Sequence, residues 1–542
     1  LPMKTILYHG KIYLHRGAFA QALEVEDGRI TRVGSDRDLL GQTTQPCRYI
    51  DCRGNLVIPG FHDSHMHLSW LGKRLHSVDL TGCTSLEELI RRGRTFLQEH
   101  SPGPGGVLQG GGWNQDCFAD TDRFPTRQDL DRISSEIPIL FARACTHVVV
   151  CNTRALEIAG INAHTTQPAG GRFELGEDGQ PNGIFRELAA DLIRSIVPPA
   201  TTEEQAADIM TAMEYLNRMG ITSVQSMDIQ GENCTCVLEA YQWIERHGYA
   251  TLRVGQQACF MDVQGLQQYL EGPYRSQQPT PMFRLGPLKL FADGSLGART
   301  ALLRQDYADA PGERGISCLS RKELQALVNL ANRNGLQCVI HCIGDAALEE
   351  TLDAFEPWSQ GGKNPLRNGV VHCQITDDAL LERMRATGTL ALVQPVFLDY
   401  DLHIVESRVG KKLADTSYAF QTMNKLGIPV SYGTDAPVES PDPYTNLYCA
   451  VTRQDRNRMP PESFHPDERV NIWDALDCYT MGSAYASFAE HSLGRLLPGY
   501  WADLAVLDQD LGAIPSEELR NTHCLLTMVR GSVVYQAPEF ST

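Results

Sequence analysis

The sequence predicts an α/β protein built on a (β/α)8 barrel, with a small discontinuous β-sandwich formed by both ends of the chain. Between about residues 56 and 434, short apolar, β-branched segments recur and are separated by helical patterns, which is typical of βα units in a parallel sheet. Short strand-like runs with turn signals fill the first 58 residues and return after about residue 490. The 542 residues are enough for a large barrel with appendages.

Eight segments have the length and composition of barrel strands. They are Leu56–Phe61, Thr222–Met227, Leu252–Phe260, Leu285–Phe291, Gln337–His341, Gly369–His372, Leu390–Val396 and Ile428–Thr434. Helical patterns lie between several of them, at Thr202–Arg218, Arg321–Asn334 and Ala346–Phe355. The first of these opens with Thr-Thr-Glu-Glu, which is a helix-capping signal.

These patterns divide the chain into two predicted domains. Residues 1–58 and 490–542 form the composite β-sandwich, and residues 59–489 form the barrel. The stretch from about residue 81 to 198 is too long for one βα unit and is an insertion after the first strand. Because loops at the carboxyl ends of barrel strands carry substrate recognition, we expect this insertion to cover the site.

Composition narrows the class of partner. The formal net charge of -18 argues against nucleic acid and against an anionic membrane surface, and favours a small-molecule substrate. No apolar run approaches the roughly 20 residues that span a bilayer, and the first residues lack a signal-peptide pattern. The 16 cysteines are scattered without a C-x-x-C pair, so we expect reduced thiols and a cytoplasmic protein. The sequence is also compatible with a homo-oligomer.

A His-x-His pair closes the first predicted strand region, in the run Pro59–His67. Residues two apart in a strand share a face, so His65 and His67 can point at one ion while Met66 points away. Taken alone, the pair is equally compatible with two surface or core histidines.

A lysine lies inside an otherwise apolar strand, in Leu288-Lys289-Leu290. Burial disfavours the charged form and lowers the lysine pKa, which would make the amine of Lys289 nucleophilic. The alternatives are a lysine whose stem snorkels to the surface, or one that pairs with Asp293.

Three more polar side chains follow later strands at the same predicted edge. His341 ends the fifth strand, His372 ends the sixth, and Asp435 follows the eighth. A single histidine in such a place is more often a hydrogen-bonded core group, and an aspartate is often a helix cap. Their repetition at successive strand ends favours a shared site.

Together, these positions resemble the amidohydrolase superfamily in both residue type and strand order. The block Lys289–Ser295 and the segment Leu493–Leu504 are similar to the branch that contains N-substituted formamide deformylases. The resemblance covers nearly the whole chain. Departures occur at Tyr500 and His62, and in the insertion at Gly112-Trp113-Asn114 and Thr146-His147, so the substrate is the feature in doubt.

The resemblance implies one or two divalent metal ions, with zinc favoured by the ligand types. His65, His67 and Asp435 would bind one ion, His341 and His372 the other, and an N6-carboxylysine at Lys289 would bridge them; a mononuclear site with fewer ligands is the alternative. A metal-activated water would hydrolyse a non-peptide, amide-type C–N bond, with Asp435 transferring the proton.

Other functions remain open at this point. The same water can deaminate an aminated ring or hydrolyse an ester or phosphoester, and a metal-free, non-catalytic relative is the alternative from another class. Three residues are candidates for substrate contact: Trp113 and His147 in the insertion, and Arg299 after the Asp293-Gly294-Ser295 turn. Loop anchoring explains Trp113 equally well, and core packing explains His147.

Overall fold

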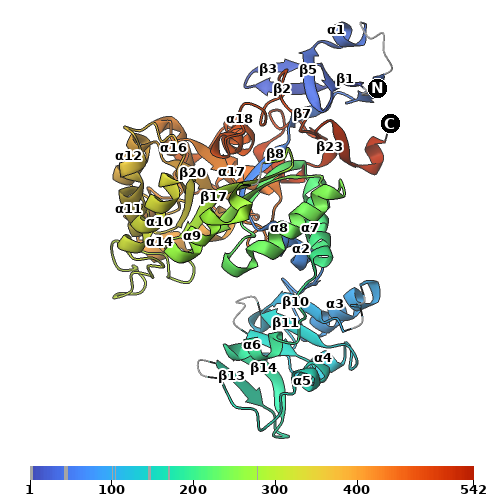
Figure 1. Ribbon diagram of the computed structural model, residues 1–542, viewed down its shortest axis with the longest axis vertical. Helices are drawn as coiled ribbons and strands as arrows, with labels where there is room; N and C mark the ends of the chain where they lie inside the picture. Colours follow the sequence, from blue (N-terminus) through green and yellow to red (C-terminus); the bar gives the residue numbers. More distant parts are fainter. Residues whose placement is uncertain are drawn as a thin grey trace. The chain divides into compact units, whose positions relative to one another are not determined.

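The computed structural model describes residues 4–41, 47–100, 102–103, 105–143, 148–168, 171–276 and 279–541 (Figure 1). The chain divides into two compact units. One contains Leu1–Leu68 and Met210–Thr542, and the other contains Ser69–Ile209.

The larger unit contains the predicted parallel barrel. Its described strands form an eight-stranded sheet in the order β21-β20-β19-β18-β17-β16-β15-β8. They are β8 (Phe61–Met66), β15 (Ile221–Ser226), β16 (Arg253–Cys259), β17 (Phe283–Phe291), β18 (Cys338–Cys342), β19 (Gly369–His372), β20 (Leu390–Val393) and β21 (Val430–Tyr432). The predicted fold class is therefore confirmed.

Contacts beyond the strand ladder bring the two edge strands together. The amide of Asp435 donates to the carbonyl of His65, and the amide of His67 donates to the carbonyl of Ala436, both at 2.8 Å. The buried carboxylate of Asp63 accepts from the Thr434 hydroxyl at 2.6 Å. These bonds connect the two segments that carry predicted ligands.

Helices connect successive strands, as a (β/α)8 barrel requires. They include α7 (Thr202–Asn217), α8 (Cys234–Arg246), α9 (Val263–Glu271), α10 (Arg321–Arg333), α11 (Asp345–Phe355), α12 (Asp378–Thr387), α16 (Phe420–Leu426) and α17 (Pro443–Thr452). The three helices expected from the sequence are present within one or two residues of their predicted bounds.

The first predicted barrel strand, Leu56–Phe61, is wrong. Residues Leu56–Pro59 form β7, which pairs antiparallel with β22 (Leu504–Leu507), and the barrel strand begins only at Phe61. Gly60 separates the two strands, and a Cβ there would lie 2.2 Å from the side chain of Thr222. Glycine thus lets the chain pass from one sheet to the other at close range.

Both ends of the chain build the sheets beside the barrel. One described sheet has the order β5-β4-β1-β6, and the other, β24-β23-β22-β7-β2-β3, combines the two ends (Figure 1). Their strands are β1 (Lys4–Tyr8), β2 (Lys11–His15), β3 (Ala18–Ala20), β4 (Ala22–Glu26), β5 (Arg29–Gly34), β6 (Cys47–Asp51), β23 (Cys524–Val529) and β24 (Ser532–Gln536). One apolar core contains Leu7, Val57, Leu504 and Leu526, which come from both sheets and both ends.

The smaller unit contains the stretch of the predicted insertion, about residues 81 to 198, and it has apolar cores of its own. Its described sheet has the order β13-β14-β12-β11-β10-β9. The elements are β9 (Val78–Asp79), β10 (Leu108–Trp113), β11 (Ile139–Arg143), β12 (Val148–Cys151), β13 (Gly171–Leu175), β14 (Pro181–Glu187), α3 (Leu86–Glu99), α4 (Arg127–Asp131), α5 (Thr153–Ala159) and α6 (Ala189–Arg194). That this unit covers the site stays a prediction.

Candidate metal centre

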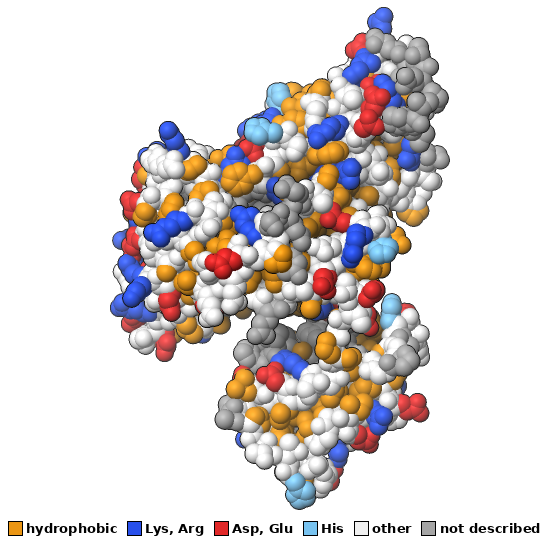
Figure 2. Space-filling view, viewed as in Figure 1, with side chains coloured by type: hydrophobic (Ala, Val, Ile, Leu, Met, Phe, Trp, Pro, Cys, Tyr) orange, Lys and Arg blue, Asp and Glu red, His pale blue; other side chains and the backbone are white. Residues whose placement is uncertain are grey.

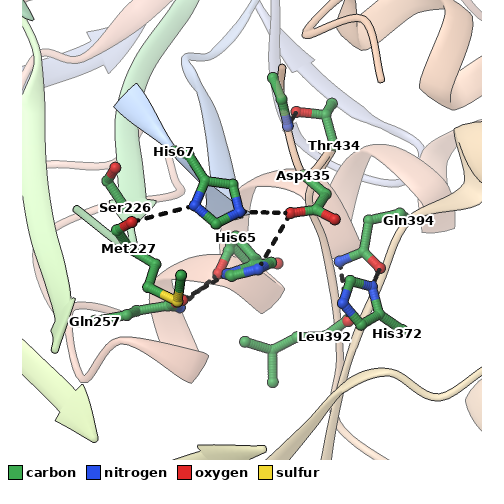
Figure 3. Close-up of polar contacts among 12 residues, drawn as sticks. His65, His67, Ser226, Met227, Gln257, His372, Leu392, Gln394, Thr434 and Asp435 are labelled. Atoms are coloured by element: carbon green, nitrogen blue, oxygen red, sulfur yellow. Dashed lines mark hydrogen bonds and ion pairs between the residues drawn. The ribbon is translucent and has the colours of Figure 1, made fainter. Parts of the chain in front are cut away.

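Three predicted ligands from separate strands converge at the carboxyl end of the barrel. One ligand atom each from His65, His372 and Asp435 lies within 4.8 Å of the others. His67 joins them, because its Nε2 lies 3.0 Å from Asp435 Oδ1, while Nε2 of His65 lies 3.3 Å from the same oxygen (Figure 3). All of these groups are buried or nearly so.

The other two predicted ligands lie beside this group. The ring of His341 lies edge-on to that of His372, with centroids 4.5 Å apart. Lys289 on β17 is fully buried, and its Nζ has no hydrogen-bond partner among the described residues. The charge of Asp435 acts on Lys289, and the charge of Lys289 acts on His65 and His341. The structure thus groups His65, His372 and Asp435, with His67 beside Asp435, His341 beside His372, and Lys289 within electrostatic reach.

Two glutamines orient two of the imidazoles. Nδ1 of His65 donates to Oε1 of Gln257 at 2.6 Å, and Nδ1 of His372 donates to Oε1 of Gln394 at 2.7 Å (Figure 3). The Nε2 amides of both glutamines donate to backbone carbonyls, which fixes their orientation. Each histidine therefore keeps Nε2 as its acceptor nitrogen, the form that a metal ligand needs.

Backbone carbonyls orient the other two imidazoles. Nδ1 of His67 donates to the carbonyl of Met227 at 3.1 Å, and Nε2 of His341 donates to the carbonyl of Gly294 at 2.9 Å. A carbonyl can only accept, so His67 keeps Nε2 and His341 keeps Nδ1 as the ligand atom. Sequence reasoning missed these four outer partners.

Burial keeps most of these rings neutral. It lowers the pKa of His65 to about 4 and that of His341 to about 3, with the charge of Lys289 adding to both shifts. Burial also lowers the pKa of Lys289, to about 8. Burial alone would raise the pKa of Asp435, but the imidazoles of His65 and His67 beside its carboxylate outweigh this and hold it well below the ordinary value.

This donor set fits a divalent ion. Neutral imidazole nitrogens and an ionised carboxylate are preferred ligands of zinc and similar metals. Lys289 has an amine that is easily deprotonated and that no described acid pairs with, so the lysine fits a role other than that of a structural cation. Asp293, the alternative partner, instead accepts the amides of Leu302, Ile343 and Gly344 at 2.7–3.0 Å.

The backbone at two of the ligands is strained. His372 has a φ of 76° and Asp435 has a φ of 60°, in the left-handed region that non-glycine residues rarely adopt. Such conformations persist where the surrounding structure holds them, and they are concentrated at functional sites. The strain is consistent with side chains held in position for a ligand.

The three candidate substrate contacts have different surroundings. Trp113 is fully buried in the core of the smaller unit, where its indole N–H donates to the carbonyl of Phe141. Arg299 forms a bidentate pair with Asp309, at 3.0 and 2.8 Å. His147 lies outside the described residues. Contact of these three residues with substrate stays a prediction.

Charged side chains of both signs mix on one face of the described part of the chain. On the face drawn in Figure 2, the described Lys and Arg side chains are interspersed with Asp and Glu. Within the described part of the chain, no helix has both the length and the apolar character needed to cross a membrane.

Comparison with known proteins agrees with this geometry. Residues 48–535 match the sequence pattern that defines the amidohydrolase family. The chain belongs to the amidohydrolase family. Membership supports a metal-dependent hydrolase, which is the chemistry that the donor set suits.

Relatives match along almost the full chain. YtcJ of Bacillus subtilis, which carries an amidohydrolase assignment, is 32% identical over 98% of this chain and 100% of its own length. The N-substituted formamide deformylase of Arthrobacter pascens is 26% identical over 96% of each chain. The crystal structure of a metal-dependent hydrolase from Pyrococcus horikoshii has a TM-score of 0.78 and 30% identity, over 95% of this chain and 99% of that one.

Proposed function

We propose that this member of the amidohydrolase family hydrolyses an amide-type, non-peptide C–N bond of a small molecule with a metal-activated water. The observation that carries the proposal is the convergence of four oriented imidazoles, the carboxylate of Asp435 and the unpaired amine of Lys289 at one end of the barrel. The similarity to an N-substituted formamide deformylase supports an amide-type substrate.

In this proposal the predicted ligands serve two ions. His65, His67 and Asp435 would hold one divalent ion, and His341 and His372 a second, with zinc favoured by the donor types. For Lys289 to act as a shared anionic ligand, its amine would have to be converted to a carbamate. The neutral amine adds to the carbon of carbon dioxide, an N–C bond forms, a proton leaves, and the resulting carbamate carries one negative charge. Burial, which lowers the pKa of Lys289 to about 8, favours the neutral amine that this reaction needs.

A divalent ion held by these residues would supply a water with a pKa of about 7 and would polarise a substrate carbonyl. Asp435 supplies the proton transfer. Its carboxylate stays ionised because His65 and His67 lie within 3.0–3.3 Å of Oδ1, so it can accept a proton from the attacking water and pass it to the leaving nitrogen. Gln257 and Gln394 keep the acceptor nitrogens of His65 and His372 turned inward.

The state of the cysteines bears on the cellular compartment that we propose. The 15 cysteines of the described residues are free thiols, which supports the predicted reducing, cytoplasmic compartment.

A substrate panel tests the proposal. The protein, loaded with zinc or manganese, is assayed on N-substituted formamides, N-acyl amines and cyclic amides, and the released amine or acid is measured. We expect turnover in at least one of these amide classes. Parallel assays for ammonia from aminated rings and for phosphate or alcohol from esters cover the other reactions that such a site can perform. Turnover confined to those substrates would contradict the amide assignment.

A further inference from the structure

A pocket lies at the other end of the barrel from the metal centre. It has a volume of about 260 Å³ and is lined by residues near the starts of β15, β16 and β17, together with Ala489, Ser492, Leu493 and Trp501. Its apolar wall includes Met282, Phe283 and Trp501, and its polar wall includes Gln225, Arg253 and Arg284. The pocket shares no lining residue with the predicted metal ligands.

The two arginines of this pocket differ in their partners. Arg253 is paired, since its guanidinium donates to both carboxylate oxygens of Asp503, at 2.5 and 3.1 Å, and to the carbonyl of Pro281. Arg284, among the residues that the structure describes, has neither a hydrogen-bond partner nor an ion-pair partner. The pocket therefore holds one cation whose charge is not neutralised by the protein.

The carboxylate whose charge acts on Arg284 is already paired with another arginine. Glu490 acts electrostatically on Arg284, but its two carboxylate oxygens accept from the guanidinium of Arg367 at 2.9 and 2.5 Å. Burial lowers the pKa of Arg284 to about 10, and the neighbouring charge of Arg253 adds to the shift. Arg284 is partly buried and remains charged at neutral pH, and a cation in such a place is normally matched by an anion.

The barrel interior near Arg284 and Arg253 is rich in hydrogen-bond donors. Such interiors are usually filled by branched apolar side chains. Here, the amide of Gln225 donates to Nε2 of His62 at 3.1 Å, which leaves Nδ1 of His62 as a buried N–H with no partner among the described residues. Gly255 makes room for the amide, since a Cβ there would lie 2.6 Å from Oε1 of Gln225. The charges of Arg284 and Arg253 also act on His62.

We propose that this pocket is a second ligand site, which binds a small monocarboxylate with an apolar body. The carboxylate pairs with Arg284, and the apolar body lies against Met282, Phe283 and Trp501. One unpaired guanidinium matches one negative charge, and the apolar wall favours an organic anion over inorganic phosphate. This inference does not depend on the reaction proposed for the metal centre.

Calorimetric titration of the metal-loaded protein in chloride-free buffer tests the site. The probes are benzoate, its neutral analogue benzamide, and inorganic phosphate. We expect wild type to bind benzoate at least tenfold more tightly than either other probe, and Arg284→Met to lose this site. Any benzoate bound at the metal centre contributes equally to both proteins, so their difference isolates the pocket. Arg29→Gln is the control. The guanidinium carbon of Arg29 lies 3.9 Å from the ring centroid of Trp501, but Arg29 does not line the pocket. Its loss should leave benzoate binding unchanged.

Thermal unfolding supplies a second readout. Without ligand, Arg284→Met should unfold at the same or a higher temperature than wild type, because an unpaired charge is removed. Benzoate should raise the Tm of wild type more than that of the variant. If Arg284→Met does not fold, Arg284→Gln replaces it in both experiments. Equal benzoate binding by wild type and variant, tighter binding of phosphate, or no binding by wild type would overturn the proposal.

Discussion

Replacing Gln394 tests whether the outer partners prepare the histidines for metal. Gln394→Met keeps the approximate volume of the side chain but removes the acceptor that lies 2.7 Å from Nδ1 of His372. Gln394 is buried, so water cannot easily take over the bond. Leaving a buried donor unsatisfied costs about 1–3 kcal/mol, and each factor of ten in affinity corresponds to about 1.4 kcal/mol. We therefore expect zinc affinity to fall by about tenfold to a hundredfold, the range known for such outer partners.

The assay is competition for zinc with a chromogenic chelator, measured alongside turnover and thermal unfolding. Gln337→Met is the matched control. Gln337 is also a buried barrel glutamine, but it lies at the start of the β18 segment and donates to the carbonyls of Arg367 and Ala486. Its loss should lower Tm without changing zinc affinity. If both variants bind zinc as wild type does, then the orientation of His372 by Gln394 has no part in metal binding.

Three further predictions concern other parts of the molecule. Lys289→Ala should abolish turnover, and short carboxylic acids should restore part of it by supplying the missing anion; full turnover of Lys289→Arg would show a structural cation instead. Burial raises the pKa of Asp401 to about 6, although the hydrogen bonds from Tyr418 and Gln374 lower it. Because the folded pKa lies above the ordinary 3.8, its ionisation destabilises the fold increasingly from about pH 4 to pH 6, so Asp401→Asn should gain Tm over wild type through that window. A difference in Tm between Asp401→Asn and wild type that stays constant from pH 4 to pH 6 would refute this. His147→Asn should change the ratio of kcat/KM for two substrates more than tenfold at constant metal content; a uniform loss with lower Tm would assign His147 to packing.

The order of the barrel could be predicted because most of its strands contain short apolar runs, and polar side chains follow or end several of these runs. His341 and His372 show this pattern, and the structure places their rings 4.5 Å apart although 31 positions separate them in the chain. Parallel strands bring their carboxyl ends to one edge, so the topology alone predicts that these residues meet.

The boundary of the first strand could not be predicted from the same pattern. Leu56–Phe61 is one nearly continuous apolar run in the sequence, but Leu56–Pro59 pairs with β22, whereas Phe61 begins β8, which pairs with β15. Periodicity does not specify which partner a strand has. The close approach of Gly60 to Thr222, which marks the change of sheet, becomes visible only in three dimensions.

The outer partners of the histidines were also beyond sequence reasoning. Gln257 and Gln394 are ordinary residues of strand segments, and nothing in the local sequence distinguishes them from other buried glutamines. The lack of a partner for Arg284 could not be predicted from the sequence either, because pairing depends on which acidic side chains the fold brings near. Contacts of this kind are set by tertiary packing, which the local sequence does not specify.

Metal content is the measurement that tests the central claim most directly. Wild-type protein purified without chelator is analysed for zinc, manganese and other transition metals per chain, beside His65→Ala. The geometry predicts between one and two equivalents in wild type, and a clear loss of metal and of turnover in a variant that stays folded. Less than about one tenth of an equivalent in wild type, or unchanged metal and turnover in His65→Ala, would contradict the assignment of this site as a metal centre.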